Sequence, residues 1–198
     1  MNRRRCSRGE LSFFFVAMLS LISSLCAAQA GNGASNVAPG QGTQSMPFSI
    51  SSSSFSNGGD IPKKFTCEDS DVSPDLRWTD PPAGTQSFAL IVDDPDAPAG
   101  RWTHWVLFDL PGQATTLAED RPKIEEIPGG GRQGRNDFRK IGYGGPCPPV
   151  GKPHRYFFKL YALDTKLNLK AGVSEAEVEQ AMKGHVLAQA ELMGKYKR

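Results

Sequence analysis

Three carboxylates and two prolines lie close together in the stretch 93–98, which reads DDPDAP. Pro95 and Pro98 have a fixed φ and no backbone donor, so this stretch cannot be the interior of a strand or a helix. We therefore expect a rigid loop that holds polar groups in fixed positions. A histidine follows between two tryptophans, in the sequence Trp102-Thr103-His104-Trp105.

A second stretch, residues 144–156, has the same design and reads GGPCPPVGKPHRY. Its prolines predict another rigid loop, and His154 and Tyr156 follow where a strand begins. We expect the two stretches to meet and to form one small pocket.

Asp94, His104, His154 and Tyr156 together have the chemistry of a site for an anion with a cationic tail. Imidazole and phenol groups donate hydrogen bonds to phosphate oxygens. A carboxylate beside a histidine orients the ring and favours its protonated form, or it attracts an ammonium group. The sequence therefore predicts a site for phosphate-bearing small ligands.

Neighbouring residues are expected to complete the pocket. Backbone amides of Gly144 and Gly145 could add donors for an anion. Trp102 and Trp105 could supply an apolar or cation–π wall.

Each of these residues also has an ordinary structural explanation, because Asp-Pro-Asp commonly forms an Asx turn and a single strand histidine is usually structural. An ester hydrolase that uses a His–Asp pair as base is a second hypothesis, although no G-x-S-x-G motif is present. A metal site of the two histidines with Asp94 or Asp96 is a third, with no H-x-H, H-E-x-x-H or C-x-x-C spacing to support it. We assign no catalytic residue, metal or cofactor.

The elements that position these residues are predicted to be mainly strands. Phe88–Val92 and Trp102–Leu110 are apolar runs that flank the first loop, and His154–Leu163 follows the second. Alternation along the last strand puts His154, Tyr156, Phe158 and Leu160 on one face. In the strand Trp102–Leu110, the same alternation puts one set of side chains on one face: Trp102, His104, Val106 and Phe108.

Outside these strands the pattern is less regular. Phe48–Phe55 predicts a first strand, and residues 112–142 predict a long irregular excursion. Ser174 and Glu177 form a capping-box pattern for a C-terminal helix. Apolar residues at helical spacing continue this helix through Leu192, with His185 in the packed stripe.

The first 30 residues predict a secretory signal peptide, with four arginines, an apolar stretch and an Ala28-Gln29-Ala30 cleavage site. Residues 31–46 predict a flexible leader, and residues 47–198 a single domain. The protein is expected to be exported, either periplasmic or secreted. A retained N-terminal anchor, or a lipoprotein modified at Cys26, is the lesser alternative, and no membrane segment is expected in the mature chain.

Removal of the signal lowers Lys+Arg from 23 to 19 and Asp+Glu from 21 to 20, so the mature chain carries a formal charge of −1. Nothing in this balance supports nucleic-acid binding. Residues 60–98 hold nine acids and three bases, whereas residues 121–159 hold nine bases and three acids. Either both regions line one site, or they are two solvated faces that balance each other.

Two cysteines remain in the mature chain, Cys67 and Cys147. In an oxidising compartment they could form a disulfide, and the alternative is two separate thiols.

The strings DDPDAP, W-x-H-W and GGPCPP-x-G-x-P-HRYFFKLYAL resemble the phosphatidylethanolamine-binding proteins, in particular their bacterial kinase-inhibitor-like branch. The resemblance extends from about Phe48 to Tyr196. It implies a mainly β fold, with an antiparallel β-sandwich-like core, peripheral helices and a C-terminal helix.

The resemblance also implies a small anion pocket near the surface. Its residues, carried over by motif, are Asp94, Asp96, Trp102, His104, Gly145, Pro149, His154 and Tyr156. The implied function is a non-enzymatic binding protein for phosphate-bearing small ligands or phospholipid head groups, and a protein partner and a homodimer are left open. Only four residues separate Pro149 from His154, fewer than we expect in eukaryotic members, so their kinase or lipid functions transfer poorly.

Overall fold

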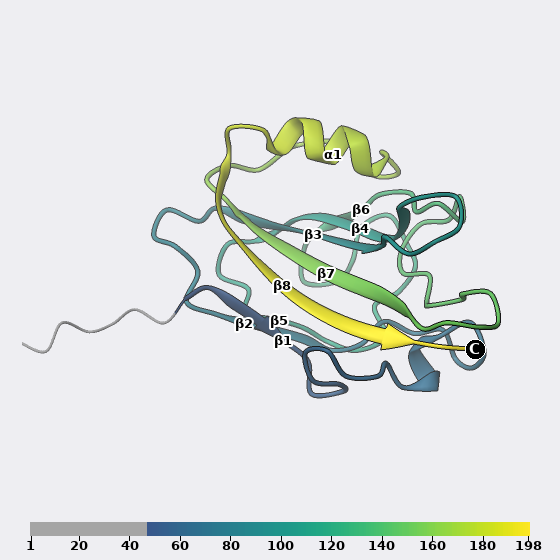
Figure 1. Cartoon of the computed structure of the whole chain (residues 1–198). Coiled ribbons are helices and arrows are strands. Elements are labelled where there is room, and N and C mark those ends of the chain that lie inside the picture. The colour runs from purple at the N-terminus through teal and green to yellow at the C-terminus, as the bar shows by residue number, and fades with distance from the viewer. Residues whose placement is uncertain (1–46) are drawn as a thin grey trace, which may run out of the picture. The chain divides into compact units, whose positions relative to one another are not determined.

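Two antiparallel sheets and one helix make up the computed structural model, which describes residues 47–198 (Figure 1). The larger sheet has the order β6-β4-β3-β7-β8 and the smaller one β1-β2-β5. The predicted signal peptide and leader lie outside the described residues. The strands of the larger sheet are β3 (Ser87–Asp94), β4 (Trp102–Pro111), β6 (Arg132–Gln133), β7 (His154–Leu163) and β8 (Val186–Tyr196). The remaining elements are β1 (Ser49–Ser51), a 3₁₀ turn at Lys63–Phe65, β2 (Leu76–Thr79), β5 (Thr116–Leu117) and helix α1 (Glu175–Met182).

Strand β3 is central because all of its residues are buried and it pairs with β4 on one side and β7 on the other. A strand covered on both faces is apolar on both, which explains the continuous run Phe88–Val92. Its side chains alternate between two clusters. Phe88, Leu90 and Val92 pack between the two sheets, whereas Ala89 and Ile91 pack beneath α1.

The core therefore has two layers, one on each face of the larger sheet. Trp78 of the smaller sheet packs edge-on against Phe88, with ring centroids 5.3 Å apart. On the other face, Val178 and Met182 of α1 are buried against Val106 and Phe108. This arrangement confirms the mainly β, antiparallel fold class, with its helix at the periphery.

A bulge in β4 overturns the expected alternation. Val92 pairs with Trp105 and Asp93 pairs with Thr103, so His104 is an extra residue between two register pairs. Such a bulge re-aims a side chain. Val106 and Phe108 face α1 as one set, while His104 lies on the other side of the sheet, against Tyr156.

The C-terminal helix is shorter than predicted. The capping box of Ser174 and Glu177 is present, but α1 ends at Met182. Gly184 then adopts a positive φ of 82°, and the chain continues as β8, which pairs along the whole of β7. The apolar spacing through Leu192 also fits a strand, because Ala190 and Leu192 are buried while Gln189 and Glu191 are exposed.

His185 was predicted to pack in the helix stripe, and this was wrong. It lies in the turn before β8, with a side chain that is half exposed, and its Nδ1 is 2.8 Å from Oδ1 of Asp164.

The first strand is also shorter than predicted, because the serines that follow it turn toward Asp75. Ser52, Ser53 and Ser54 all donate hydrogen bonds to its carboxylate. Partial burial raises the pKa of Asp75, but these hydrogen bonds outweigh it and hold the pKa at about 2.

Residues 112–142 are mostly irregular, as expected, with two short strands. Gln133 anchors this excursion to the sheet, since its buried Oε1 accepts from Trp105 Nε1 at 2.6 Å. Within residues 47–198 no helix is long and apolar enough to cross a membrane.

Candidate functional site

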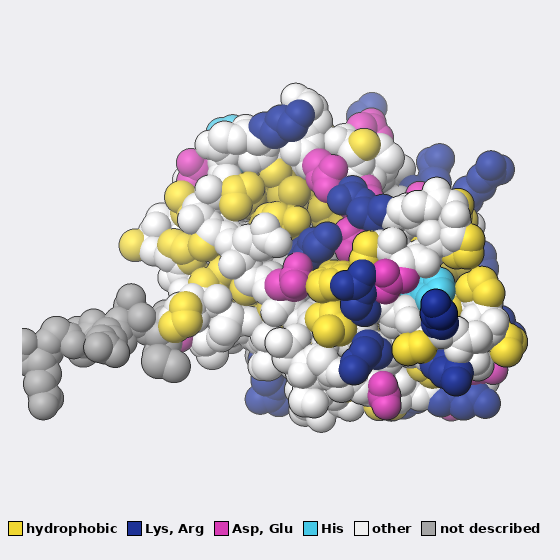
Figure 2. Space-filling view, in the orientation of Figure 1, with side chains coloured by type: hydrophobic (Ala, Val, Ile, Leu, Met, Phe, Trp, Pro, Cys, Tyr) yellow, Lys and Arg dark blue, Asp and Glu magenta, His cyan; other side chains and the backbone are white. Residues whose placement is uncertain are grey.

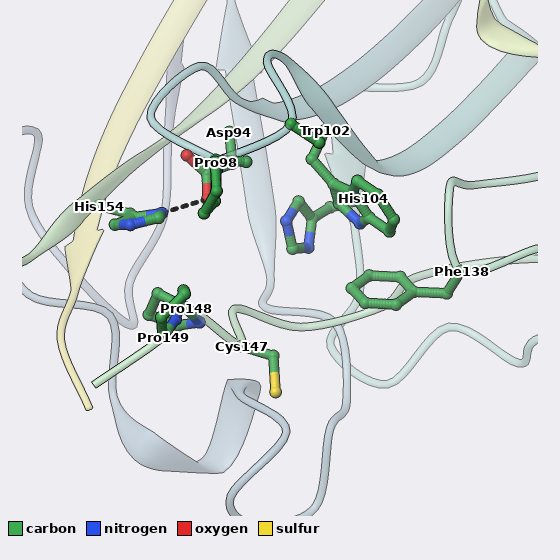
Figure 3. A pocket seen from close by; sticks show the side chains of 11 residues that line it. Asp94, Pro98, Trp102, His104, Phe138, Cys147, Pro148, Pro149 and His154 are labelled. Carbon is green, nitrogen blue, oxygen red and sulfur yellow. Dashed lines mark hydrogen bonds and ion pairs between the residues drawn. The ribbon is translucent and has the colours of Figure 1, made fainter. Parts of the chain in front are cut away.

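A small cavity of about 230 Å³ lies at the end of the larger sheet where β3 ends and β7 begins (Figure 3). The β3–β4 loop forms one wall and the loop before β7 forms the opposite wall. The residues that line it are Asp94, Ala97, Pro98, Ala99, Trp102, His104, Phe138, Cys147, Pro148, Pro149 and His154. Most are apolar or proline, so a few polar atoms determine what the cavity can bind.

His104 is held by the backbone of the opposite loop. Its Nδ1 is 2.6 Å from the carbonyl oxygen of Gly144, and Gly144 N–H donates back to the His104 carbonyl at 2.9 Å. Because a carbonyl only accepts, Nδ1 carries the proton. Burial lowers the pKa of His104, and the hydrogen bond to Gly144 and the charge of Asp94 oppose this shift without cancelling it.

His154 is held by Asp94, which joins the two walls of the cavity. Nδ1 of His154 is 2.8 Å from Oδ2 of Asp94, and both side chains are largely buried. The other oxygen of Asp94 accepts the backbone N–H of Asp96 at 2.8 Å. This second contact is an Asx turn within the Asp-Pro-Asp segment, so the structural explanation holds for Asp94, which also lines the cavity.

Asp96 does not line the cavity. Its carboxylate accepts from Arg155 Nε at 2.8 Å and Nη2 at 2.7 Å, and from the Arg155 backbone N–H. These contacts with Arg155 hold the pKa of Asp96 at about 2. The residue therefore fastens the β3–β4 loop to β7 rather than facing a ligand.

Tyr156 lies behind the cavity lining, with its ring centroid 5.2 Å from that of His104. Its hydroxyl is buried and has no hydrogen-bond partner that meets normal geometry within the described chain. Burial and the nearby charge of Asp94 raise the pKa of Tyr156, so the phenol stays protonated. It packs edge-on against the ring of His104, and its buried hydroxyl lies beside the Asp94 carboxylate.

Gly145 cannot supply a backbone donor to the cavity, because its N–H is bound to Oδ1 of Asp71 at 2.6 Å. A Cβ at this position would lie 2.3 Å from the Phe65 carbonyl oxygen. Glycine is therefore required here by close packing of two backbone segments. The expectation that loop amides donate to an anion is wrong for Gly145.

The apolar wall consists of Trp102 and Phe138, whose ring centroids are 5.5 Å apart (Figure 3). Trp105, predicted to share this wall, is instead buried in the core. Phe138 was not predicted, because it lies in the irregular excursion, where no periodicity marks it. Pro149 lies in the wall as expected, together with Pro148.

Cys147 lies in the cavity wall and is joined to Cys67 by a disulfide, with Cα atoms 5.4 Å apart. The alternative of two separate thiols is therefore not what the structure shows. Next to the disulfide, Cys67 N–H donates to the Pro146 carbonyl at 3.1 Å. Between Pro148 and Pro153, no residue makes a hydrogen bond to another described residue.

Acidic and basic side chains alternate on the face in Figure 2 below α1 rather than forming two separate regions. Several acids of the stretch 60–98 pair directly with bases of the stretch 121–159. These pairs are Asp71–Lys123, Asp93–Lys159 and Asp96–Arg155. Three acids of the one stretch and three bases of the other are therefore neutralised in ion pairs, none of which lines the cavity.

No group of three or more His, Cys, Asp or Glu side chains within residues 47–198 is placed to hold a metal ion.

The fold and the cavity together define a small β protein with a recessed pocket of two histidines and one carboxylate. The family model of the phosphatidylethanolamine-binding proteins matches residues 51–197. The chain belongs to this family, as its motifs predicted.

Relatives in other organisms extend this similarity. A UPF0098 protein of Aquifex aeolicus is 54% identical over 151 residues, which cover 75% of this chain and 88% of that protein. A UPF0098 protein of Methanothermobacter thermautotrophicus is 49% identical over 151 residues, 76% of this chain and 99% of that protein. The crystal structure of YbcL from E. coli, described as a member of the mammalian PEBP family, has a TM-score of 0.72 and 37% identity. The match covers 76% of this chain and 98% of that one.

Proposed function

We propose that this chain is an exported binding protein whose cavity holds a phosphate-bearing group, such as a phospholipid head group or a phosphorylated side chain. One observation carries the proposal. Two imidazoles, His104 and His154, line one small cavity, and each has its Nδ1 bound to an acceptor of the protein. No group within residues 47–198 hydrogen-bonds to either Nε2 atom, so both remain for a ligand.

The protonation of these rings decides what they bind. Because the partner of each Nδ1 is an acceptor, Nδ1 carries a proton and Nε2 of the neutral ring is an acceptor. Nε2 of the imidazolium is instead a charged donor, which binds a phosphate oxygen strongly. Anion binding should therefore strengthen as pH falls toward the pKa of His104, which burial lowers.

Asp94 adds a negative charge to the same cavity. It disfavours a bare anion and favours a ligand whose phosphate is joined to an ammonium or another cationic group. Phosphoethanolamine has this composition, so we expect it to bind more tightly than inorganic phosphate. The cavity of about 230 Å³ suits a head group or side chain and lies below the range of about 300–1,000 Å³ typical of drug-sized ligands.

An ester hydrolase is less well supported. Among the described residues that line the cavity there is no serine or threonine, and its one cysteine is in a disulfide. A hydrolytic role would have to use water activated by the His154–Asp94 pair, a contribution of about 10²–10⁴-fold at most.

Export is proposed from the signal sequence and is consistent with a disulfide, which persists in oxidising compartments. Cell fractionation with N-terminal sequencing tests it. We expect an exported chain that begins after Ala30, and a full-length cytoplasmic chain would overturn this part.

Isothermal titration calorimetry tests the binding function. Phosphoethanolamine, phosphate and sulfate are titrated at about pH 6 and about pH 8. Sulfate keeps its charge over this range, so a change in its affinity reports the protein alone. The variants are His104→Ala and His154→Ala, with His185→Ala as a matched control because that histidine lies outside the cavity.

We expect all three ligands to bind, more tightly at the lower pH, and to lose affinity in both cavity variants. Equal heats in all variants, or no saturable binding, would contradict the phosphate site. If the protein releases nitrophenol from a chromogenic ester and His154→Ala abolishes this release, ester hydrolysis would replace binding as the proposed function.

A further inference from the structure

A second and larger hollow lies beside the start of α1, between the loop after β6 and the loop that precedes the helix. Its volume is about 740 Å³, compared with about 230 Å³ for the ligand cavity. We call it the α1 groove. Its lining is Trp102, Arg135, Asn136, Asp137, Arg139, Lys170, Ala171, Gly172, Val173, Ser174 and Glu177.

Three exposed cations of the α1 groove have no side-chain partner among residues 47–198. The side chains of Arg135, Arg139 and Lys170 make no hydrogen bond or ion pair with any residue that the structure describes. Other bases nearby are paired, as Lys123 is with Asp71, Arg132 with Glu126 and Lys159 with Asp93. Arg135 and Arg139 bring two unpaired charges of the stretch 121–159 into the groove, and Lys170 adds a third from outside that stretch.

The two carboxylates of the α1 groove are bound to other donors. Asp137 Oδ2 accepts the Thr103 backbone N–H at 2.7 Å. Glu177 Oε2 accepts the Ser174 N–H at 2.8 Å and its hydroxyl at 2.7 Å. Neither acid is within ion-pair distance of the three cations, although the charge of Arg135 contributes, after the hydrogen bonds from Ser174, to the lowered pKa of Glu177.

We propose that the α1 groove binds an extended acidic segment of a partner protein. The three cations supply charge complementarity to carboxylates, and Trp102, Ala171 and Val173 supply apolar contact between them. Trp102 also lines the ligand cavity, so the groove and the cavity share one wall residue.

A peptide fits these observations better than a nucleic acid does. Asp137 and Glu177 interrupt the positive surface, and a regular polyanion would meet them as well as the cations. Residues 31–198 contain 19 bases and 20 acids, so the chain lacks the overall positive charge that is typical of nucleic-acid-binding domains.

The test measures binding of a fluorescein-labelled decapeptide of alternating glutamate and serine by fluorescence anisotropy, at low and at physiological salt. The groove variant is Arg135→Gln/Arg139→Gln/Lys170→Gln. A matched control, Lys166→Gln/Lys183→Gln/Lys197→Gln, removes the same charge at exposed positions outside the α1 groove. A labelled single-stranded oligonucleotide and anionic vesicles of phosphatidylglycerol are measured in parallel.

We expect saturable peptide binding that weakens about tenfold in the groove variant, the sum of three exposed charge pairs. The control variant should change affinity less than about threefold. Equal losses in both variants, no saturable binding, or tighter binding of the oligonucleotide or the vesicles would overturn the proposal. Calorimetry with phosphoethanolamine on the groove variant separates this proposal from the ligand cavity, whose affinity should be retained.

Discussion

Asp94 and His154 are 60 residues apart in the chain, yet Oδ2 of one lies 2.8 Å from Nδ1 of the other. Asp94 is the last residue of β3 and His154 is the first residue of β7. Because these strands pair antiparallel, the end of one adjoins the start of the other. The sheet itself thus brings the two polar groups to one place, and the proline-rich loops close around them.

Asp94→Asn should change which ligands the cavity prefers. The amide keeps the size of the side chain and an acceptor for the Asp96 N–H, but it removes the negative charge. It also turns an NH2 group toward Nδ1 of His154, which must then accept and leave the ring proton on Nε2. Inorganic phosphate should bind at least about threefold more tightly, since a like charge is gone. Phosphoethanolamine should gain less, because its ammonium group loses a partner.

The ratio of the two dissociation constants measures this effect by calorimetry, independently of any general change in folding. A ratio equal to that of the unmodified protein would show that Asp94 does not face the cationic part of the ligand.

Protonation of His104 should lower the free energy of unfolding as the solution is made mildly acidic. The pKa of His104 in the folded state is lowered by burial below the ordinary 6.5 that applies when the chain is unfolded. Between these two pKa values the unfolded chain binds more protons, so the free energy of unfolding falls as pH decreases. Each unit of difference in pKa contributes about 1.4 kcal/mol.

Urea unfolding at about pH 7.5 and about pH 5.5 tests this sign. His104→Gln should reduce the loss on acidification, whereas His185→Gln, at an exposed position, is the control. Saturating phosphate should also reduce the loss, because it favours the imidazolium of the folded protein. A loss of equal size in His104→Gln would assign the pH dependence to other groups.

The strands and loops of the site could be predicted because their signals are local. Prolines break the chain at Asp93–Pro98 and before His154, and apolar runs mark the strands that flank them. The short loop makes β3 and β4 neighbours, whereas the pairing of β3 with β7 is shown only by the structure.

Other features depend on contacts that no local pattern shows. The bulge at His104 moves one side chain across the sheet, so strict alternation assigns it to the wrong face. Phe138 reaches the cavity from an irregular loop, and the Gly145 N–H is taken by Asp71, which lies 74 residues earlier. The spacing of apolar residues in Val186–Leu192 fits either a helix or a strand. The strand forms because Gly184, with its positive φ, ends the helix and because the backbone that follows pairs with the edge of β7.

Loss of the disulfide should reduce stability strongly and ligand affinity moderately. Cys67→Ser/Cys147→Ser opens a link across 80 residues, which is worth about 4–5 kcal/mol in the chain-entropy account. The Cys67–Pro146 backbone hydrogen bond and the His104–Gly144 contact still hold the wall, so the cavity should loosen rather than disappear.

Urea unfolding and phosphoethanolamine titration measure the two effects, with mass mapping under non-reducing conditions to establish the disulfide in the unmodified protein. Two free thiols in the unmodified protein, or an unchanged midpoint in the double variant, would contradict this account.

Tyr156→Phe should separate stability from binding. The Tyr156 hydroxyl is buried beside the Asp94 carboxylate without a hydrogen bond of normal geometry in the described chain, so it contributes little to stability or lowers it. Its removal leaves the ring against His104 and should keep or raise the free energy of unfolding, by up to about 1 kcal/mol. If the phenol instead donates to a bound phosphate, the same change should weaken phosphate binding, because a donor is lost from the complex. For this one variant we therefore expect an unchanged or higher free energy of unfolding and a lower affinity for phosphate. A lower free energy of unfolding with unchanged affinity would show that the hydroxyl serves the fold alone.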